Sequence, residues 1–188
     1  MSDYVSLVEA RRQLRIDGYE TYADVGLDGP WTTPYHLASC SPTGPVLLTY
    51  NYLDAPSARR HRDVLWADGY LGSMPFNKVL DLALTASGMT RADLYVTHAF
   101  HLLPPSRSAV VPASAIDLSF DAVARHELAG RTVIALGAVA ARSCRRHGIA
   151  HSPIPHLSAR GLSFARRAAV LAEALQQAKL TCPSGRST

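Results

Sequence analysis

Residues 132–146 read TVIALGAVAARSCRR, a short apolar run followed by a glycine and then by small and basic residues. The run from Thr132 to Leu136 is typical of a buried strand. Gly137 then turns the chain into a helix, which we expect from Ala138 to Arg146 and which Gly148 ends. A strand followed at once by a helix is the repeating unit of α/β proteins.

The same alternation extends over most of the chain. Further strands are predicted at Val46–Tyr50, Leu94–Thr97 and, more briefly, His151–Pro155. Apolar residues at helical spacing predict helices in three segments, which are Pro75 to Gly88, Ser119 to Gly130, and Phe164 to Ala178. This order predicts an α/β fold: a three-layer α/β/α sandwich with a central, mostly parallel four-stranded sheet, in one domain with its core at about residues 44–180.

Length and composition indicate a single soluble globular domain. The chain has 188 residues, of which 47% are hydrophobic and 18% charged, which is enough for a core and unlike a disordered chain. Without a membrane-length apolar run or a signal-peptide pattern, we expect a cytoplasmic protein with no membrane partner. The cysteines Cys40, Cys144 and Cys182 show no CxxC spacing, so neither a metal site nor a disulfide framework is expected.

The basic residues are almost all arginine, although the net charge is only +4. The planar guanidinium group suits phosphate oxygens better than a point charge does. The arginines gather in three clusters, which are Arg59, Arg60 and Arg62, then Arg142, Arg145 and Arg146, then Arg160, Arg166 and Arg167. These clusters are compatible with a nucleic-acid interface or with solvated helix faces.

Ligands of open α/β sheets bind beyond the carboxyl ends of the strands. The residues that follow the four predicted strands are Asn51, His98, Gly137 and His156. These are the first candidates for a functional site.

Three segments resemble the uracil-DNA glycosylase superfamily. Residues 127–144 (ELAGRTVIALGAVAARSC) are similar to the VIVALGxxAA run of the iron–sulfur uracil-DNA glycosylases, and residues 94–105 (LYVTHAFHLLPP) resemble their YxTNxxKCRPP segment. Residues 78–89 (KVLDLALTASGM) look like the helix that precedes this segment. The similarity spans roughly Val46 to Gln177. It implies the fold of this superfamily and hydrolysis of the bond between a base and its deoxyribose.

The resemblance also implies the catalytic residues. Residues 46–56 (VLLTYNYLDAP) stand where the superfamily has GQDPYH, GEAPG or GMNPG, so that Asn51 falls at the position of the Asn that holds the attacking water. Asp54 is the competing water-activating group, because a carboxylate is the stronger base. The PHLS segment at 155–158 resembles the HPS motif, and its His156 would stabilise the departing base.

Residues near these motifs are expected to contact DNA. The loop after His156 resembles the wedge that fills the gap left by a flipped nucleotide, with Leu157, Ser158, Arg160 and Leu162 as its contacts. Gly137 opens a helix whose first amides can receive a phosphate.

The base pocket departs from the pattern of the superfamily. His98 stands in place of the Asn that pairs with uracil, and Tyr52 in place of a Pro. An imidazole offers one nitrogen in a given direction, whereas an amide offers a donor and an acceptor side by side. A modified or non-uracil pyrimidine is therefore favoured over uracil.

Other residues complete the expected pocket. Tyr70 and Phe76 are candidates for the aromatic floor under the base, and Asn77 is a candidate for the amide that position 98 lacks. Leu102 replaces the cysteine of KCRPP, so no iron–sulfur cluster and no other cofactor is expected.

The sequence thus predicts a monofunctional DNA glycosylase, acting as a monomer on single- or double-stranded DNA. Four alternatives remain open. They are a uracil-DNA glycosylase of base-excision repair, an anti-phage glycosylase that removes glucosylated hydroxymethylcytosine, a non-catalytic protein that binds modified DNA, and a nucleotide-processing enzyme, for which no GxxxxGK[ST] or GxGxxG motif is present.

Overall fold

Four parallel strands form the central sheet, in the order β2-β1-β3-β4. The computed structural model describes residues 3–181, and its strands are β1 (Val46–Asn51), β2 (Tyr95–Phe100), β3 (Val133–Leu136) and β4 (Ser152–Ile154). β1 lies at the centre, with β2 on one side and β3 on the other. Its first three side chains, Val46, Leu47 and Leu48, are buried on both faces of the sheet, which explains the apolar run with which the strand begins.

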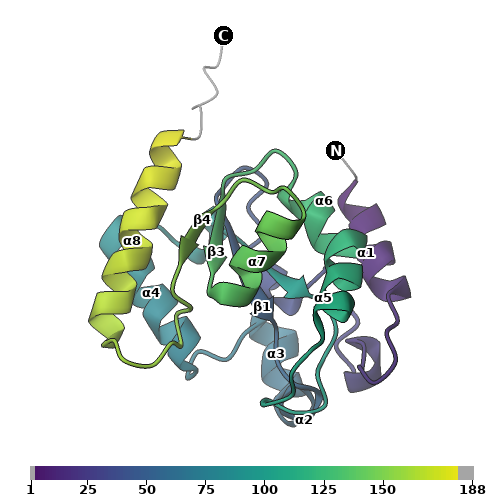
Figure 1. Cartoon of the computed structure of the whole chain (residues 1–188). Coiled ribbons are helices and arrows are strands. Elements are labelled where there is room, and N and C mark those ends of the chain that lie inside the picture. The colour runs from purple at the N-terminus through teal and green to yellow at the C-terminus, as the bar shows by residue number, and fades with distance from the viewer. Residues whose placement is uncertain (1–2, 182–188) are drawn as a thin grey trace.

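Helices cover both faces of the sheet, and this confirms the predicted α/β/α sandwich (Figure 1). On one face, α4 (Pro75–Ser87) and α8 (Phe164–Thr181) pack against each other and against Leu47 and Ile134. On the other face, α7 (Ala138–Arg146) and a continuous run of helix cover Leu48 and Ala135. That run consists of α5 (Ala113–Ser119), a π-helical turn (Phe120–Ala124) and α6 (Arg125–Leu128).

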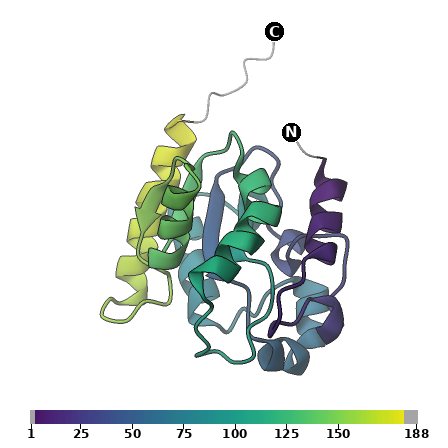
Figure 2. The same ribbon diagram turned by 45° about the vertical axis from the view of Figure 1, so that its right-hand side comes forward.

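The remaining elements surround this sandwich. α1 (Tyr4–Gln13) lies on the side opposite α8, and Figure 2 shows it beside the helices of the second face. α2 (Ala55–Arg60) and α3 (Arg62–Asp68) follow β1 and lie below the sheet in Figure 1. Three short 3₁₀ turns, η1 (Ala23–Val25), η2 (Pro34–Leu37) and η3 (Arg91–Asp93), connect the longer elements.

Two predicted helices are confirmed closely. α4 ends at Gly88, whose φ of 62° is the left-handed conformation expected of a helix C-cap. α7 has the predicted bounds, from Ala138 to Arg146.

The predicted end of the second strand is wrong. β2 continues beyond Thr97 to Phe100, so His98 lies within the strand rather than after it. His98 is 1% exposed, yet both of its ring nitrogens bond threonine hydroxyls. A polar side chain is accommodated inside a buried strand when its hydrogen bonds are satisfied there.

The start of the helix predicted from Ser119 is also wrong. The helix begins at Ala113, directly after Pro112, and Ser119 lies inside it. The Ser119 hydroxyl instead accepts a hydrogen bond from the backbone N–H of His101 at 2.8 Å. The serine therefore joins the helix to the loop after β2, a tertiary role that its sequence context does not reveal.

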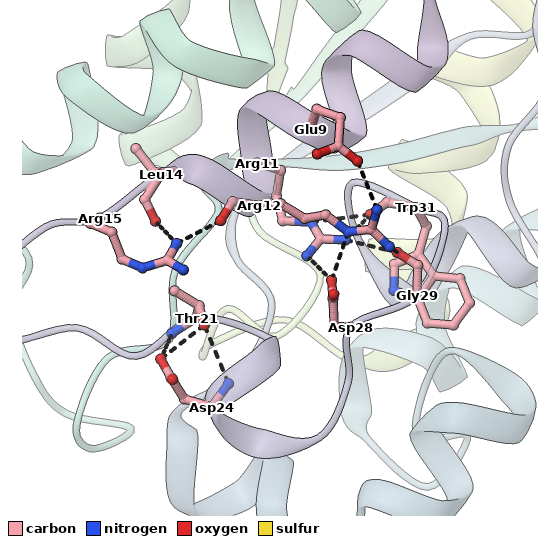
Figure 3. A network of polar contacts seen from close by, with 10 residues as sticks. All are labelled: Glu9, Arg11, Arg12, Leu14, Arg15, Thr21, Asp24, Asp28, Gly29 and Trp31. Carbon is pink, nitrogen blue, oxygen red and sulfur yellow. Dashed lines mark hydrogen bonds and ion pairs between the residues drawn. The ribbon is translucent and has the colours of Figure 1, made fainter.

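The N-terminal segment, for which the sequence predicted no element, packs on the core through Arg11 (Figure 3). The guanidinium group of Arg11 is 1% exposed and donates to the carbonyls of Trp31 and Gly29 at 2.6 to 3.1 Å. It also pairs with the Asp28 carboxylate at 2.7 Å. One side chain thus fixes the loop that leads into η2.

Arg11→Ala is expected to lower the free energy of unfolding by about 3 kcal/mol, because two buried carbonyls and a carboxylate lose their donor. Arg12→Ala is the matched control, since the neighbouring side chain is 37% exposed and water screens its ion pairs, so a much smaller loss is expected. Urea unfolding of both variants measures the difference. Equal losses would show that Arg11 does not anchor the segment.

A buried carboxylate lies on the face of β2 that α6 covers. Glu127 is 3% exposed and accepts hydrogen bonds from the hydroxyls of Thr32, Tyr95 and Thr97 at 2.5 to 2.8 Å. His101 Nε2 lies 3.3 Å from its second oxygen. Burial raises the pKa of Glu127, but the hydrogen bonds and positive charge around it outweigh burial and hold that pKa well below its usual range.

Because the folded-state pKa of Glu127 is lowered, its ionised form stabilises the fold above about pH 4.3, and this contribution is lost as the pH falls further. Glu127→Gln should therefore destabilise the protein by on the order of 3 kcal/mol at pH 7 and by less at pH 3. Urea unfolding at both pH values measures this, with the exposed Glu173→Gln as control. A loss independent of pH would contradict the ionised state.

Candidate active site

A cavity of about 610 Å³ opens at the carboxyl ends of β1 and β3, where ligands of open α/β sheets bind. Its volume is within the range of small-molecule sites. Nine of the residues singled out from the sequence line it, namely Asn51, Tyr52, Asp54, Tyr70, Phe76, His98, Gly137, His156 and Ser158. Four others, Asn77, Leu157, Arg160 and Leu162, do not line it.

Asn51 is the last residue of β1 and is only partly buried. Its amide nitrogen donates to the carbonyl of Leu53 at 3.4 Å, a long bond that orients the side chain. No hydrogen bond to the amide oxygen occurs within residues 3–181, so that oxygen can accept one from a water or a ligand. Asn51 thus has the geometry of a group that positions water.

Asp54 is already engaged in a structural role. One carboxylate oxygen accepts from the backbone N–H of Ser57 and the other from its hydroxyl, both at 2.9 Å. These bonds cap α2 at its N-terminus. The side chain still lines the cavity, but two of its acceptor sites hold the helix start.

His156 follows β4 and faces the cavity beside Gly137. Burial, and then the charge of Arg167, lower its pKa, so the ring is neutral at pH 7. Its Nδ1 accepts from the backbone N–H of Ser158 at 3.2 Å, which places the ring hydrogen on Nε2. His156 therefore carries a neutral N–H donor on Nε2.

Gly137 permits this position of His156. Its φ of 88° and ψ of 174° lie in a region that is essentially restricted to glycine. A Cβ atom there would lie 3.0 Å from the His156 Cβ. The glycine at the strand–helix junction thus brings the imidazole against the end of β3.

His98 lines the cavity but offers no free nitrogen to it. Nδ1 lies 2.7 Å from the Thr49 hydroxyl and Nε2 lies 2.9 Å from the Thr33 hydroxyl. Burial lowers its pKa well below the usual value, so the ring is neutral. In this arrangement His98 shapes the cavity and fixes Thr49 rather than presenting a polar atom to a ligand.

Aromatic rings form much of the wall. Tyr52 donates its hydroxyl hydrogen to the carbonyl of Gly69 at 2.9 Å, and its ring meets that of Tyr35 edge-on. The ring of Phe76 lies 5.6 Å from that of His156. Tyr70 is parallel to Tyr35, with the ring centroids 6.1 Å apart. Such a wall can hold a planar heterocycle by stacking or edge contacts.

Asn77 lies behind this wall, completely buried. Its oxygen accepts from Tyr35 and Arg91, and its nitrogen donates to the carbonyl of Leu71 at 2.9 Å. Both the oxygen and the nitrogen of the amide thus bond groups of the wall, where Arg91 also stacks over Tyr70 at 3.7 Å. Asn77 is therefore a positioning residue rather than a group facing the cavity.

The loop after His156 divides into a buried and an exposed part. Leu157 is 1% exposed, and its carbonyl accepts from Arg167, so it is a core residue rather than the exposed wedge that was expected. Arg160 and Leu162 are exposed at the surface.

Tyr35, Arg60 and Arg107 are among the lining residues that the sequence analysis did not single out as site residues. Tyr35 comes from η2, in the N-terminal segment where no element was predicted. Arg60 and Arg107 are exposed arginines at the cavity, and neither makes an ion pair within the described part of the chain. Arg60 belongs to an arginine cluster visible in the sequence, whereas nothing in the sequence singles out Tyr35 or Arg107.

No arrangement of three or more His, Cys, Asp or Glu side chains suited to a metal ion occurs among residues 3–181. Cys40 and Cys144 are free thiols, and Cys182 lies outside the described residues. None of the helices in that range is long and apolar enough to cross a membrane.

Comparison with protein-family models and with curated proteins identified no related protein. No protein-family model matches the chain, and no curated protein matches it significantly.

Gly137→Ala is expected to lower the free energy of unfolding by about 3 kcal/mol, because it combines a glycine-only backbone conformation with contact to His156. Gly148→Ala is the matched control, since Gly148 has a φ of 66° but open space around its Cβ position, and should lose about 1 kcal/mol. Urea unfolding measures both losses, and the imidazole NMR signals of His156 should shift only in Gly137→Ala. Unchanged signals would show that Gly137 does not position His156.

Proposed function

We propose that the protein is a monofunctional DNA glycosylase that hydrolyses the N-glycosidic bond of a flipped pyrimidine nucleotide. One observation carries this proposal. The cavity combines a free amide oxygen on Asn51 with a neutral Nε2–H donor on His156, inside a largely aromatic wall. The sequence resemblance to uracil-DNA glycosylases supports the same reaction through the same two residues.

In this reaction the Asn51 oxygen accepts a hydrogen bond from a water and aims it at C1′ of the deoxyribose. The C1′–N bond breaks with its electron pair leaving on the base, and the water oxygen forms the new bond to C1′ while its proton passes to solvent. An amide is a weak base, so bond breaking runs ahead of attack and the sugar carries positive charge in the transition state. Stabilisation of the leaving base is then the main contribution of the protein to lowering the activation barrier.

His156 supplies that stabilisation. Its Nε2–H donates to the oxygen on which the departing pyrimidine gathers negative charge, and a preorganised donor of this kind is worth on the order of 3 kcal/mol. The lowered pKa of His156 keeps the ring neutral, so the contact does not depend on capturing a proton at neutral pH.

The expected base is a modified or non-uracil pyrimidine. Both His98 nitrogens are engaged within the protein, and Asn77 is buried behind the wall, so neither reads the uracil edge in this arrangement. Arg60 and Arg107, exposed at the cavity, are suited to the phosphates on either side of the flipped nucleotide.

The test is incubation with single- and double-stranded DNA that carries uracil, a G:T mismatch, hydroxymethylcytosine or glucosylated hydroxymethylcytosine, followed by alkaline cleavage of abasic sites. We expect cleavage at one of the modified cytosines. Asn51→Ala and His156→Ala should each lower the rate about 100-fold while DNA binding is retained, since both act on the chemical step. The exposed His126→Ala is the control and should keep the wild-type rate.

Cleavage of uracil alone would assign the protein to base-excision repair. DNA binding without strand breaks on any substrate would exclude a glycosylase and favour a protein that captures modified bases without cutting.

A further inference from the structure

A second hollow lies beside the candidate active site. It has a volume of about 400 Å³, and Tyr50 and Val139 line both spaces. Its other walls come from the loop before α5, from α5 and from α7, and include Val110, Val111, Ile116, Asp117, Arg142 and Arg146. The two hollows therefore adjoin along the carboxyl edge of the sheet, on either side of the end of β1.

The aromatic ring between the hollows is held in place. Tyr50 is the fifth residue of β1, and its hydroxyl accepts a hydrogen bond from the backbone N–H of Val111 at 3.2 Å. The ring is half-buried, so part of its surface remains accessible. A fixed aromatic side chain with accessible surface is the usual platform on which nucleobases stack, whatever their sequence.

The charges around the second hollow favour an anionic ligand. Among residues 3–181, Asp117 is the one carboxylate that lines this hollow, and it pairs with Arg146, so its charge is balanced. Arg142 is exposed and has no ion-pair partner within residues 3–181. This arrangement suits a nucleotide, because the apolar floor can contact the flat base while the unpaired guanidinium group contacts the phosphate.

We propose that the second hollow binds the nucleotide next to the flipped one on the same strand. Its base stacks at Tyr50 and against the apolar floor, and Arg142 contacts its phosphate. The inference rests on the proposed glycosylase function, because the first hollow must then hold a nucleotide of the same strand. It further implies that the protein grips a locally unstacked strand and that affinity depends on this neighbour.

Two matched pairs of variants test the subsite. Ala113 is exposed and lines the second hollow, so Ala113→Trp fills it, whereas Ser114→Trp adds the same side chain one residue further along α5, outside the hollow. Arg142→Glu and Arg145→Glu make the same change in net charge on the same helix, but only Arg142 lines the hollow. None of these four residues lines the first cavity.

The probe is a short fluorescein-labelled single strand of thymidines with a tetrahydrofuran abasic-site analogue at its centre, measured by fluorescence anisotropy. Ala113→Trp and Arg142→Glu should weaken binding at least about tenfold relative to Ser114→Trp and Arg145→Glu. Arg142→Glu should also reduce the slope of log affinity against log salt by about 0.7, the value for one phosphate contact on a single strand.

Two shorter probes, which end at the analogue on its 5′ or its 3′ side, locate the neighbour. One of them should bind all four variants equally, because it has no nucleotide to place in the second hollow. If the wild-type protein binds the full probe and all four variants bind it equally well, the subsite is wrong while the glycosylase proposal stands. If the wild-type protein neither binds this DNA nor forms abasic sites, both proposals fail together.

Discussion

The candidate active site depends on the buried hydrogen bonds of His98. This residue lies in β2, directly opposite Thr49 of β1, and its two nitrogens join Thr49 to Thr33 of the N-terminal segment. Thr33 precedes η2, which carries Tyr35 into the cavity wall. Because a buried imidazole with an unmet hydrogen bond is costly, these contacts lock three separate parts of the chain into one arrangement.

A second polar cluster lies on the opposite face of β2. Glu127 receives three hydroxyl donors there and contacts His101, so an ionised carboxylate is held inside the core. Its donors come from the N-terminal segment and from β2, and the carboxylate itself comes from α6. Polar contacts on both faces of β2 therefore fix the N-terminal segment against the sheet, and with it the aromatic wall of the cavity. The framework of the site is held by polar bonds as well as by apolar packing.

The chemistry of the cavity follows from where polar atoms remain free. Both ring nitrogens of His98 are bonded inside the protein, Asn77 is buried away from the cavity, and each Asp54 oxygen accepts one hydrogen bond at the start of α2. The Asn51 oxygen and the His156 Nε2–H are left for a ligand. These two available groups are the ones that the proposed hydrolysis needs, namely an acceptor that holds a water and a neutral donor.

The order of elements and the location of the site were decided largely by the sequence. Strands and helices leave local patterns of apolar residues and glycines, so TVIALG and the helix after it could be identified from residues close together in the chain. Because ligands of open α/β sheets bind beyond the carboxyl ends of the strands, the predicted strand ends then pointed to Asn51, Gly137 and His156. Only the tertiary structure decided which polar groups are free. Apart from the Asn77 bond to Leu71, the bonds of His98, Asn77 and Glu127 join residues 14 to 95 positions apart, and the burial of Arg11 and Tyr35 depends on segments distant in sequence. Such contacts leave no periodic pattern along the chain, because they arise from where elements meet rather than from how each one forms.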